Sequence, residues 1–138
     1  MSSICIFGVF VVDLCFFGKS IPARGETILG SKHIVGPGGK GSNQAIAAAR
    51  LNGKVNFITK LGKDSNATMA LDLYSQSGVN IDGVIQDPNL STGVAAIMID
   101  ENGHNAINIV SGAAGHLEKE DINKNLEIIK KSKIFLTQ

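Results

Sequence analysis

A long apolar segment at residues 3–12 limits the folds open to this chain. Val, Ile and Phe dominate it without regular polar alternation, which is typical of a strand covered on both faces inside an α/β sheet. Asp13 follows, so we expect its carboxylate at the carboxyl end of that strand, where ligands bind in open α/β folds. Asp13 places a charge within the longer apolar run, and no basic residue precedes Lys19. These two features argue against a signal peptide or a membrane span.

The segments that follow alternate between extended and helical patterns. They predict a short extended region at 26–36, a helix at 42–51, a strand at 54–62, a helix from Asp64 to about Ser77 and an extended piece at 79–85. The first helix is rich in alanine, which lets it pack closely on a sheet, and Gly78 ends the second. The alternation predicts the α/β class.

The last third of the chain changes this rhythm. Residues 92–110 predict a hairpin, because two extended runs flank the turn-forming dipeptide Asn102-Gly103. A helix is predicted at 118–132 and a further buried strand at 133–138. Since a strand of this type normally leads into a loop that carries function, we expect the 138 residues to be the N-terminal half of a larger α/β domain.

Composition narrows the range of partners and compartments. A chain of 138 residues with 43% hydrophobic content buries one ordinary core. The net charge of +1 gives no reason to expect nucleic acid or an anionic membrane as a partner. Cys5 and Cys15 have no CxxC partner, and we interpret them as reduced thiols of a cytoplasmic protein.

The glycine-rich stretch "GPGGKGSNQAIAAARLNG" at 36–53 has three interpretations. Its glycines allow a tight entry into a closely packed helix, which needs no ligand. Gly36, Gly38 and Gly41 also satisfy G-x-G-x-x-G, the pattern of a dinucleotide site at a helix start. That pattern belongs after the first long strand, whereas here it follows a short extended piece, so the match is weak.

The third interpretation combines this loop with Asp13. A carboxylate accepts hydrogen bonds from neighbouring hydroxyls, Lys40 donates, Asn43 both donates and accepts, and glycines let backbone amides approach a ligand. These groups together predict a site for a sugar or another polyol.

Asp13, the glycine-rich stretch and three further motifs resemble those of a known family, the ribokinase or phosphofructokinase-B type of sugar kinases. The resemblance covers essentially the whole chain and rests on Asp13 and four motifs, which are "PARGET" at 22–27, "GGKGSNQA" at 38–45, "GKD" at 62–64 and "STGVAAIMID" at 91–100. It implies a sheet with flanking helices and a small β lid, formed by strands at about 14–35 and 92–110. In this family the lid closes over the sugar, and in ribokinases it pairs with a second subunit, which implies a homodimer.

The resemblance also assigns roles to individual residues. By similarity, the sugar contacts are Asp13, Gly39, Lys40 and Asn43, and the lid residues on or near the inner face are Asn108 and Ile109. Val11 stands where the family has an asparagine that holds sugar hydroxyls, and Val9 stands where a serine is usual. One sugar contact of the family pattern is therefore missing from this chain.

The activity that the resemblance implies is phosphoryl transfer from ATP, with Mg²⁺, to a sugar hydroxyl, and ribose is the expected sugar. The catalytic aspartate lies in a Gly-Ala-Gly-Asp type motif of the family's C-terminal half, as does the ATP site. We therefore expect no catalytic, cofactor-binding or metal-binding residue here, and an isolated chain that is inactive. The alternative is a non-catalytic remnant that only binds sugar or self-associates.

The three histidines are not expected to act in catalysis or metal binding. "AAGH" at 113–116 imitates the catalytic motif with His116 in place of the aspartate, but it follows the predicted hairpin and lacks the helix of small residues. His33 and His104 have no metal-ligand spacing and are predicted to be solvated.

Overall fold

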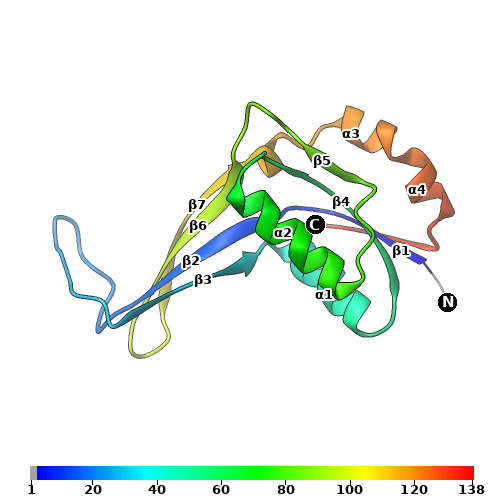
Figure 1. Ribbon diagram of the computed structural model, residues 1–138. Helices are drawn as coiled ribbons and strands as arrows, with labels where there is room; N and C mark the ends of the chain where they lie inside the picture. Colours follow the sequence, from blue (N-terminus) through cyan, green and yellow to red (C-terminus); the bar gives the residue numbers. More distant parts are fainter. Residues whose placement is uncertain (1–2) are drawn as a thin grey trace.

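The computed structural model describes residues 3–138, whose strands form two four-stranded sheets (Figure 1). The core sheet has the order β5-β4-β1-β8 and is parallel throughout. Its strands are β1 (Ser3–Phe7), β4 (Lys54–Leu61), β5 (Val84–Gln86) and β8 (Ile134–Thr137). The lid sheet has the order β3-β2-β6-β7. Its strands are β2 (Val11–Phe17), β3 (Lys32–Gly38), β6 (Thr92–Ile99) and β7 (Asn105–Gly112).

Helices cover both sides of the core sheet (Figure 1). One side carries α1 (Lys40–Arg50) and α2 (Ser65–Ser77), and the other carries α3 (Lys119–Lys124) and α4 (Leu126–Lys131), which follow the 3₁₀ turn η1 (Ala113–His116). In the part of the chain that the structure describes, no helix is long and apolar enough to cross a membrane.

Aromatic packing centres the core between β4 and the first two helices. The Tyr74 ring of α2 makes edge contacts with Phe57 at 5.3 Å and with Phe10 at 6.1 Å between ring centroids. Its hydroxyl lies 3.0 Å from the Ser42 hydroxyl of α1, so this buried polar group is satisfied. The contact joins the two helices near the start of α1.

The local signals for α2 and the hairpin are confirmed. Asp64 is the N-cap of α2 and accepts a hydrogen bond from the Ala67 N–H at 2.8 Å, and Gly78 ends the helix with a φ of 73°. Strands β6 and β7 pair antiparallel across a turn in which Gly103 has a φ of 83°. The alanine-rich helix is confirmed as α1.

The prediction of one strand over 3–12, ending at Asp13, is wrong. β1 ends at Phe7, and the chain crosses into the lid sheet, where Asp13 is an interior residue of β2. The crossing occurs at Gly8, where a Cβ would lie 2.9 Å from the Gly41 Cα of α1. Both halves of the run are apolar because one is buried in the core and the other lies at the base of the lid, so composition does not change at the break.

Three further expectations need correction. Residues 18–31 form no strand, and the lid strands run from Val11 and from Lys32 instead of spanning 14–35. The helix predicted at 118–132 is divided at Asn125, whose side-chain amide donates to the Asp121 carbonyl at 2.8 Å. The last strand, β8, pairs with β1, but its side chains are exposed rather than buried.

Candidate functional site

A cavity of about 400 Å³ lies between the lid sheet and the start of α1. Its polar lining consists of Asp13 from β2, Gly39, Lys40 and Asn43 from the helix entry, and the terminal Gln138. The structure thus brings together the four residues singled out as sugar contacts, although they come from two separate elements. Most of the remaining lining is apolar and belongs to the lid sheet.

The two candidate lid contacts are placed differently. Ile109 lines the cavity, whereas Asn108 is not part of the lining. Ile109 pairs with Ala95, and Asn108 pairs with Ala96, in the ladder between β6 and β7. Since successive side chains of a strand point to opposite faces, Asn108 belongs to the outer face of the lid.

Asp13 supplies the carboxylate of the cavity. It pairs with Gly36 of β3 and Ala95 of β6, and a Cβ on the nearby Gly38 would overlap its carboxylate. Burial raises the pKa of Asp13 above its usual value. Within residues 3–138, Asp13 has no hydrogen bond or ion pair through its side chain, so both oxygens are available to a ligand.

The entry of α1 supplies the groups that face this carboxylate. Gly39 has a φ of 90°, and a Cβ there would collide with the Val9 carbonyl, so this position requires glycine. The Ser42 N–H donates to that same carbonyl at 3.2 Å, which holds the helix start against the crossing from β1 to β2. Lys40 and Asn43 are three residues apart and therefore share one helix face.

This arrangement argues against the nucleotide interpretation of the glycine pattern. Gly36 and Gly38 are strand residues of β3, and they flank Asp13 instead of forming a free loop before the helix. A phosphate at this helix start would meet the Asp13 carboxylate, and like charges at short range repel. Hydroxyl groups of a neutral ligand meet no such penalty.

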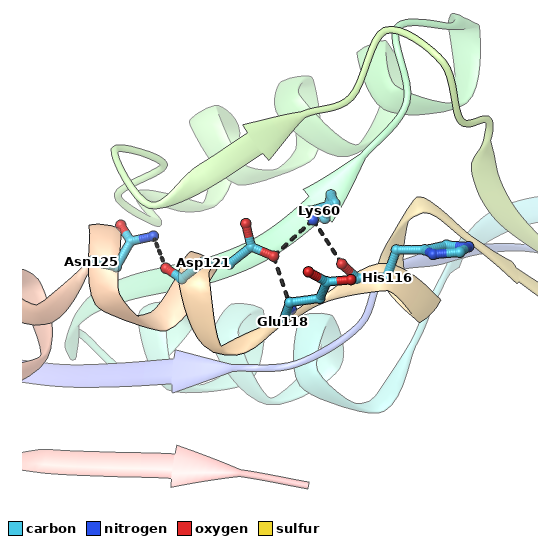
Figure 2. A network of polar contacts seen from close by, with 5 residues as sticks. All are labelled: Lys60, His116, Glu118, Asp121 and Asn125. Carbon is cyan, nitrogen blue, oxygen red and sulfur yellow. Dashed lines mark hydrogen bonds and ion pairs between the residues drawn. The ribbon is translucent and has the colours of Figure 1, made fainter.

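A network of polar contacts anchors the C-terminal end of the lid hairpin, just beyond β7 (Figure 2). The Lys60 ammonium of β4 lies 2.7 Å from the Asp121 carboxylate and donates to the His116 carbonyl at 2.7 Å. The two charged side chains are only 12% and 5% exposed. Because η1 directly follows β7, the network ties the end of β7 to the core sheet. His116 contributes its backbone carbonyl to this contact.

The ionisation of Asp121 follows from this network. Burial alone would raise its pKa, but the hydrogen bond from Lys60, the Glu118 N–H and the Lys60 charge together hold the pKa of Asp121 below its usual value. The sequence signal for this pair was weak, since Lys60 and Asp121 are far apart along the chain and each resembles an ordinary surface charge.

Asp64 anchors the other end of the hairpin. Besides capping α2, its carboxylate accepts a hydrogen bond from the Thr92 N–H at 2.7 Å, at the first residue of β6. The Thr92 hydroxyl in turn accepts from the Gly62 N–H at 2.9 Å. Burial would raise the pKa of Asp64, but the backbone N–H groups of Thr92 and Ala67 lower it overall. The capping role was predicted, and the link to the lid was not.

Other candidate reactive groups lie outside this site. Cys5 is buried, and burial raises its pKa to about 11, which makes the thiol a poor nucleophile. His104 is exposed in the hairpin turn and lies 3.1 Å from the Asp100 carboxylate. His33 is exposed and stacks on Phe16. Among residues 3–138, no group of three or more His, Cys, Asp or Glu side chains is arranged to hold a metal ion.

Comparison with known proteins agrees with this architecture, an α/β core sheet joined to a smaller β sheet. Residues 1–138 match the pfkB family carbohydrate kinases, and the chain belongs to this family. It is 38% identical over 135 residues to the deoxyribokinase of Salmonella typhi, which covers 98% of this chain and 44% of that protein. It is 33% identical over 137 residues to the ribokinase of Mus musculus, covering 99% of this chain and 42% of that protein.

Solved structures of ribokinases share the fold. The ribokinase of Giardia lamblia superposes with a TM-score of 0.91 at 32% identity, over 99% of this chain and 41% of its own. The ribokinase of Arabidopsis thaliana, solved with ribose and ATP, superposes with a TM-score of 0.82 at 30% identity, over 99% of this chain and 45% of its own. The chain thus spans less than half the length of these relatives.

Proposed function

We propose that this chain forms the sugar-binding part of an ATP-dependent carbohydrate kinase that acts on a pentose. The observation that carries the proposal is the cavity that the Asp13 carboxylate shares with Lys40 and Asn43, in which this carboxylate has no side-chain partner among residues 3–138. Ribose, the sugar expected from the sequence, and deoxyribose are the two candidates, since related proteins are named ribokinase and deoxyribokinase.

Each residue of the cavity has a defined part in this proposal. Asp13 accepts hydrogen bonds from two sugar hydroxyls, and Lys40 and Asn43 donate to others from the helix side. Gly39 lets the backbone approach the ring. Ile109 and its neighbours on the lid cover the C–H face of the sugar and exclude water, which strengthens the polar contacts beneath them.

ATP with Mg²⁺ is the phosphate donor that family membership implies, and a solved relative contains ATP. When bound, the nucleotide supplies the phosphoryl group, and the metal neutralises the charge that develops. The residues described here do not fit either group, because the helix start faces a carboxylate and no acidic cluster is present within 3–138. We therefore expect the catalytic aspartate and the ATP site outside this chain, and an isolated chain without kinase activity.

We also propose a homodimer formed through the lid. Ile34, Ile107 and Ile109 belong to the inner face of the lid sheet and are about half exposed. A second lid packed on this face would cover apolar area that is otherwise exposed to water. The alternative function, a remnant that binds sugar or self-associates without reaction, needs the same cavity and the same lid. Both functions leave this chain inactive on its own, so the two are separated by sequencing the gene beyond the Gln138 codon for a continuation that carries a Gly-x-Gly-Asp motif.

The test of sugar binding is equilibrium dialysis of the chain with labelled ribose and labelled deoxyribose. We expect at least one sugar to bind, and Asp13→Asn to weaken it by about tenfold or more, because hydrogen bonds to a charged acceptor are lost. Asp87→Asn is the matched control on an exposed turn and should leave binding unchanged. Equal binding by wild type and Asp13→Asn would contradict the proposed site. ADP formation by the chain alone with ATP and sugar would contradict its expected inactivity.

A further inference from the structure

The lid side of the cavity offers few polar groups to a sugar. In the row of paired residues nearest α1, Val11 of β2 lies between Gly38 of β3 and Gly93 of β6. A Cβ on Gly93 would lie 2.9 Å from a Val11 methyl, which shows that the valine side chain covers that glycine. Neither glycine has a side chain, so neither supplies a polar side-chain group beside Val11.

The Asp13 carboxylate is adjacent to this apolar surface. Val11 and Asp13 are two residues apart on one strand and therefore face the same side of the sheet, and both line the cavity. Val9 lines it as well. A sugar held by Asp13 thus has one neighbouring position that points at valine methyl groups. Val11 is only 3% exposed, so this part of the cavity wall is closely packed.

A hydroxyl at that position would be unfavourable. It would leave its water partners on binding and find no polar side chain among Val9, Val11, Gly38 and Gly93. A bridging water would gain little, because a buried water needs two or more polar partners and the only polar side chain on this wall of the cavity is that of Asp13. A carbon without a hydroxyl would instead gain apolar contact.

We propose that Val11 selects a deoxypentose over ribose. This inference rests on the proposed function and narrows it, because it names the sugar that the cavity prefers. Asp13, Lys40 and Asn43 still bind the hydroxyls that the two sugars share, and Val11 penalises the additional hydroxyl of ribose. The preference is thus set by the apolar wall, while the shared polar contacts supply affinity for both sugars.

The experiment is a competition between D-ribose and 2-deoxy-D-ribose for the chain, followed by ligand-detected NMR. We expect the deoxy sugar to bind about tenfold to a hundredfold more tightly, the upper value being the scale on which an apolar pocket rejects an added hydroxyl. Val11→Thr keeps the side-chain shape and adds a hydroxyl to the wall, so it should lower this ratio severalfold. Val11→Ala keeps the wall apolar and should retain the preference for the deoxy sugar.

Val94→Thr is the matched control, because Val94 pairs with Val12 and packs toward the core on the opposite face of the lid. It should change stability without changing the ratio of the two affinities. Ribose binding as tightly as the deoxy sugar would overturn the inference and leave the proposed function intact. Binding of neither sugar would overturn both. A ratio that Val11→Thr leaves unchanged would show that Val11 does not set the preference.

Discussion

The core sheet and the lid sheet contain similar apolar residues but bury them to different extents. Phe57 and Ile58 of β4 are fully buried, whereas Ile107 and Ile109 of β7 are 56% and 57% exposed. The core sheet has helices on both sides, while the lid projects away from them (Figure 1). Apolar side chains in the core therefore stabilise the fold, and those in the lid are available to a ligand or a second subunit.

The polar contacts of the two regions differ in the same way. The two ends of the lid hairpin are attached to the core by carboxylates with several partners, Asp64 at the start of β6 and Asp121 beyond the end of β7. The carboxylate inside the cavity, Asp13, has no side-chain partner within 3–138. Satisfied carboxylates thus hold the lid in place, and the unsatisfied one marks the position that a ligand would occupy.

The largest expected effect is a truncation in the core. Phe57→Ala removes a fully buried ring that contacts Tyr74, and we expect it to lower the free energy of unfolding by about 3–5 kcal/mol. Ile107→Ala, a truncation at an exposed lid position, should change it by about 0.5 kcal/mol or less. Urea denaturation of the two variants measures the difference. Equal losses would show that the lid is packed as tightly as the core.

The next effect concerns the attachment of the lid. Asp121→Asn removes the charge that Lys60 faces in a nearly buried site, and we expect a loss of about 3 kcal/mol together with faster amide hydrogen exchange at the end of β7. Lys130→Met disrupts an exposed ion pair with Glu127 and is expected to cost at most about 0.5 kcal/mol. Unchanged exchange in β7 would mean that the pair stabilises α3 without restraining the lid.

The smallest expected effect is a dependence of folding stability on pH, which has one sign for Asp64 and Asp121 and the opposite sign for Asp13. The pKa values of Asp64 and Asp121 are lowered in the folded state, so their stabilisation is present above about pH 4 and is lost as the pH falls through the folded values. The pKa of Asp13 is raised, so its contribution has the opposite sign, and stability declines as the pH rises from about 4 through the folded value.

Asp13→Asn should therefore raise stability at neutral pH while it weakens sugar binding. Thermal unfolding between pH 3 and 7 measures this gain, which should vanish at the acidic end. A variant less stable than wild type at pH 7 would show that Asp13 serves the fold instead of the ligand.

Much of the local structure was predictable from the sequence because local rules determine it. Asp64 before a helical pattern and Gly78 after it defined α2, and Asn102-Gly103 defined the hairpin turn. The glycine requirement at Gly39 and the shared face of Lys40 and Asn43 follow from the loop and the helical spacing. Most of these signals lie within a few residues of the structure that they specify, so they can be recognised without knowledge of the tertiary contacts.

Tertiary structure decided the features that depend on distant segments. Gly8 became the boundary between the two sheets because the backbone of Gly41 passes against it, and this moved Asp13 from a strand end into the lid. The pairing of Lys60 with Asp121 likewise required α3 to pack beside β4. The sequence by itself determined the α/β class and the helix entry, and it singled out the polar residues that the fold gathers in one cavity. Only the fold brought Asp13 and Val11 onto the wall that faces Lys40, because strand pairing and helix packing join residues that no local signal connects.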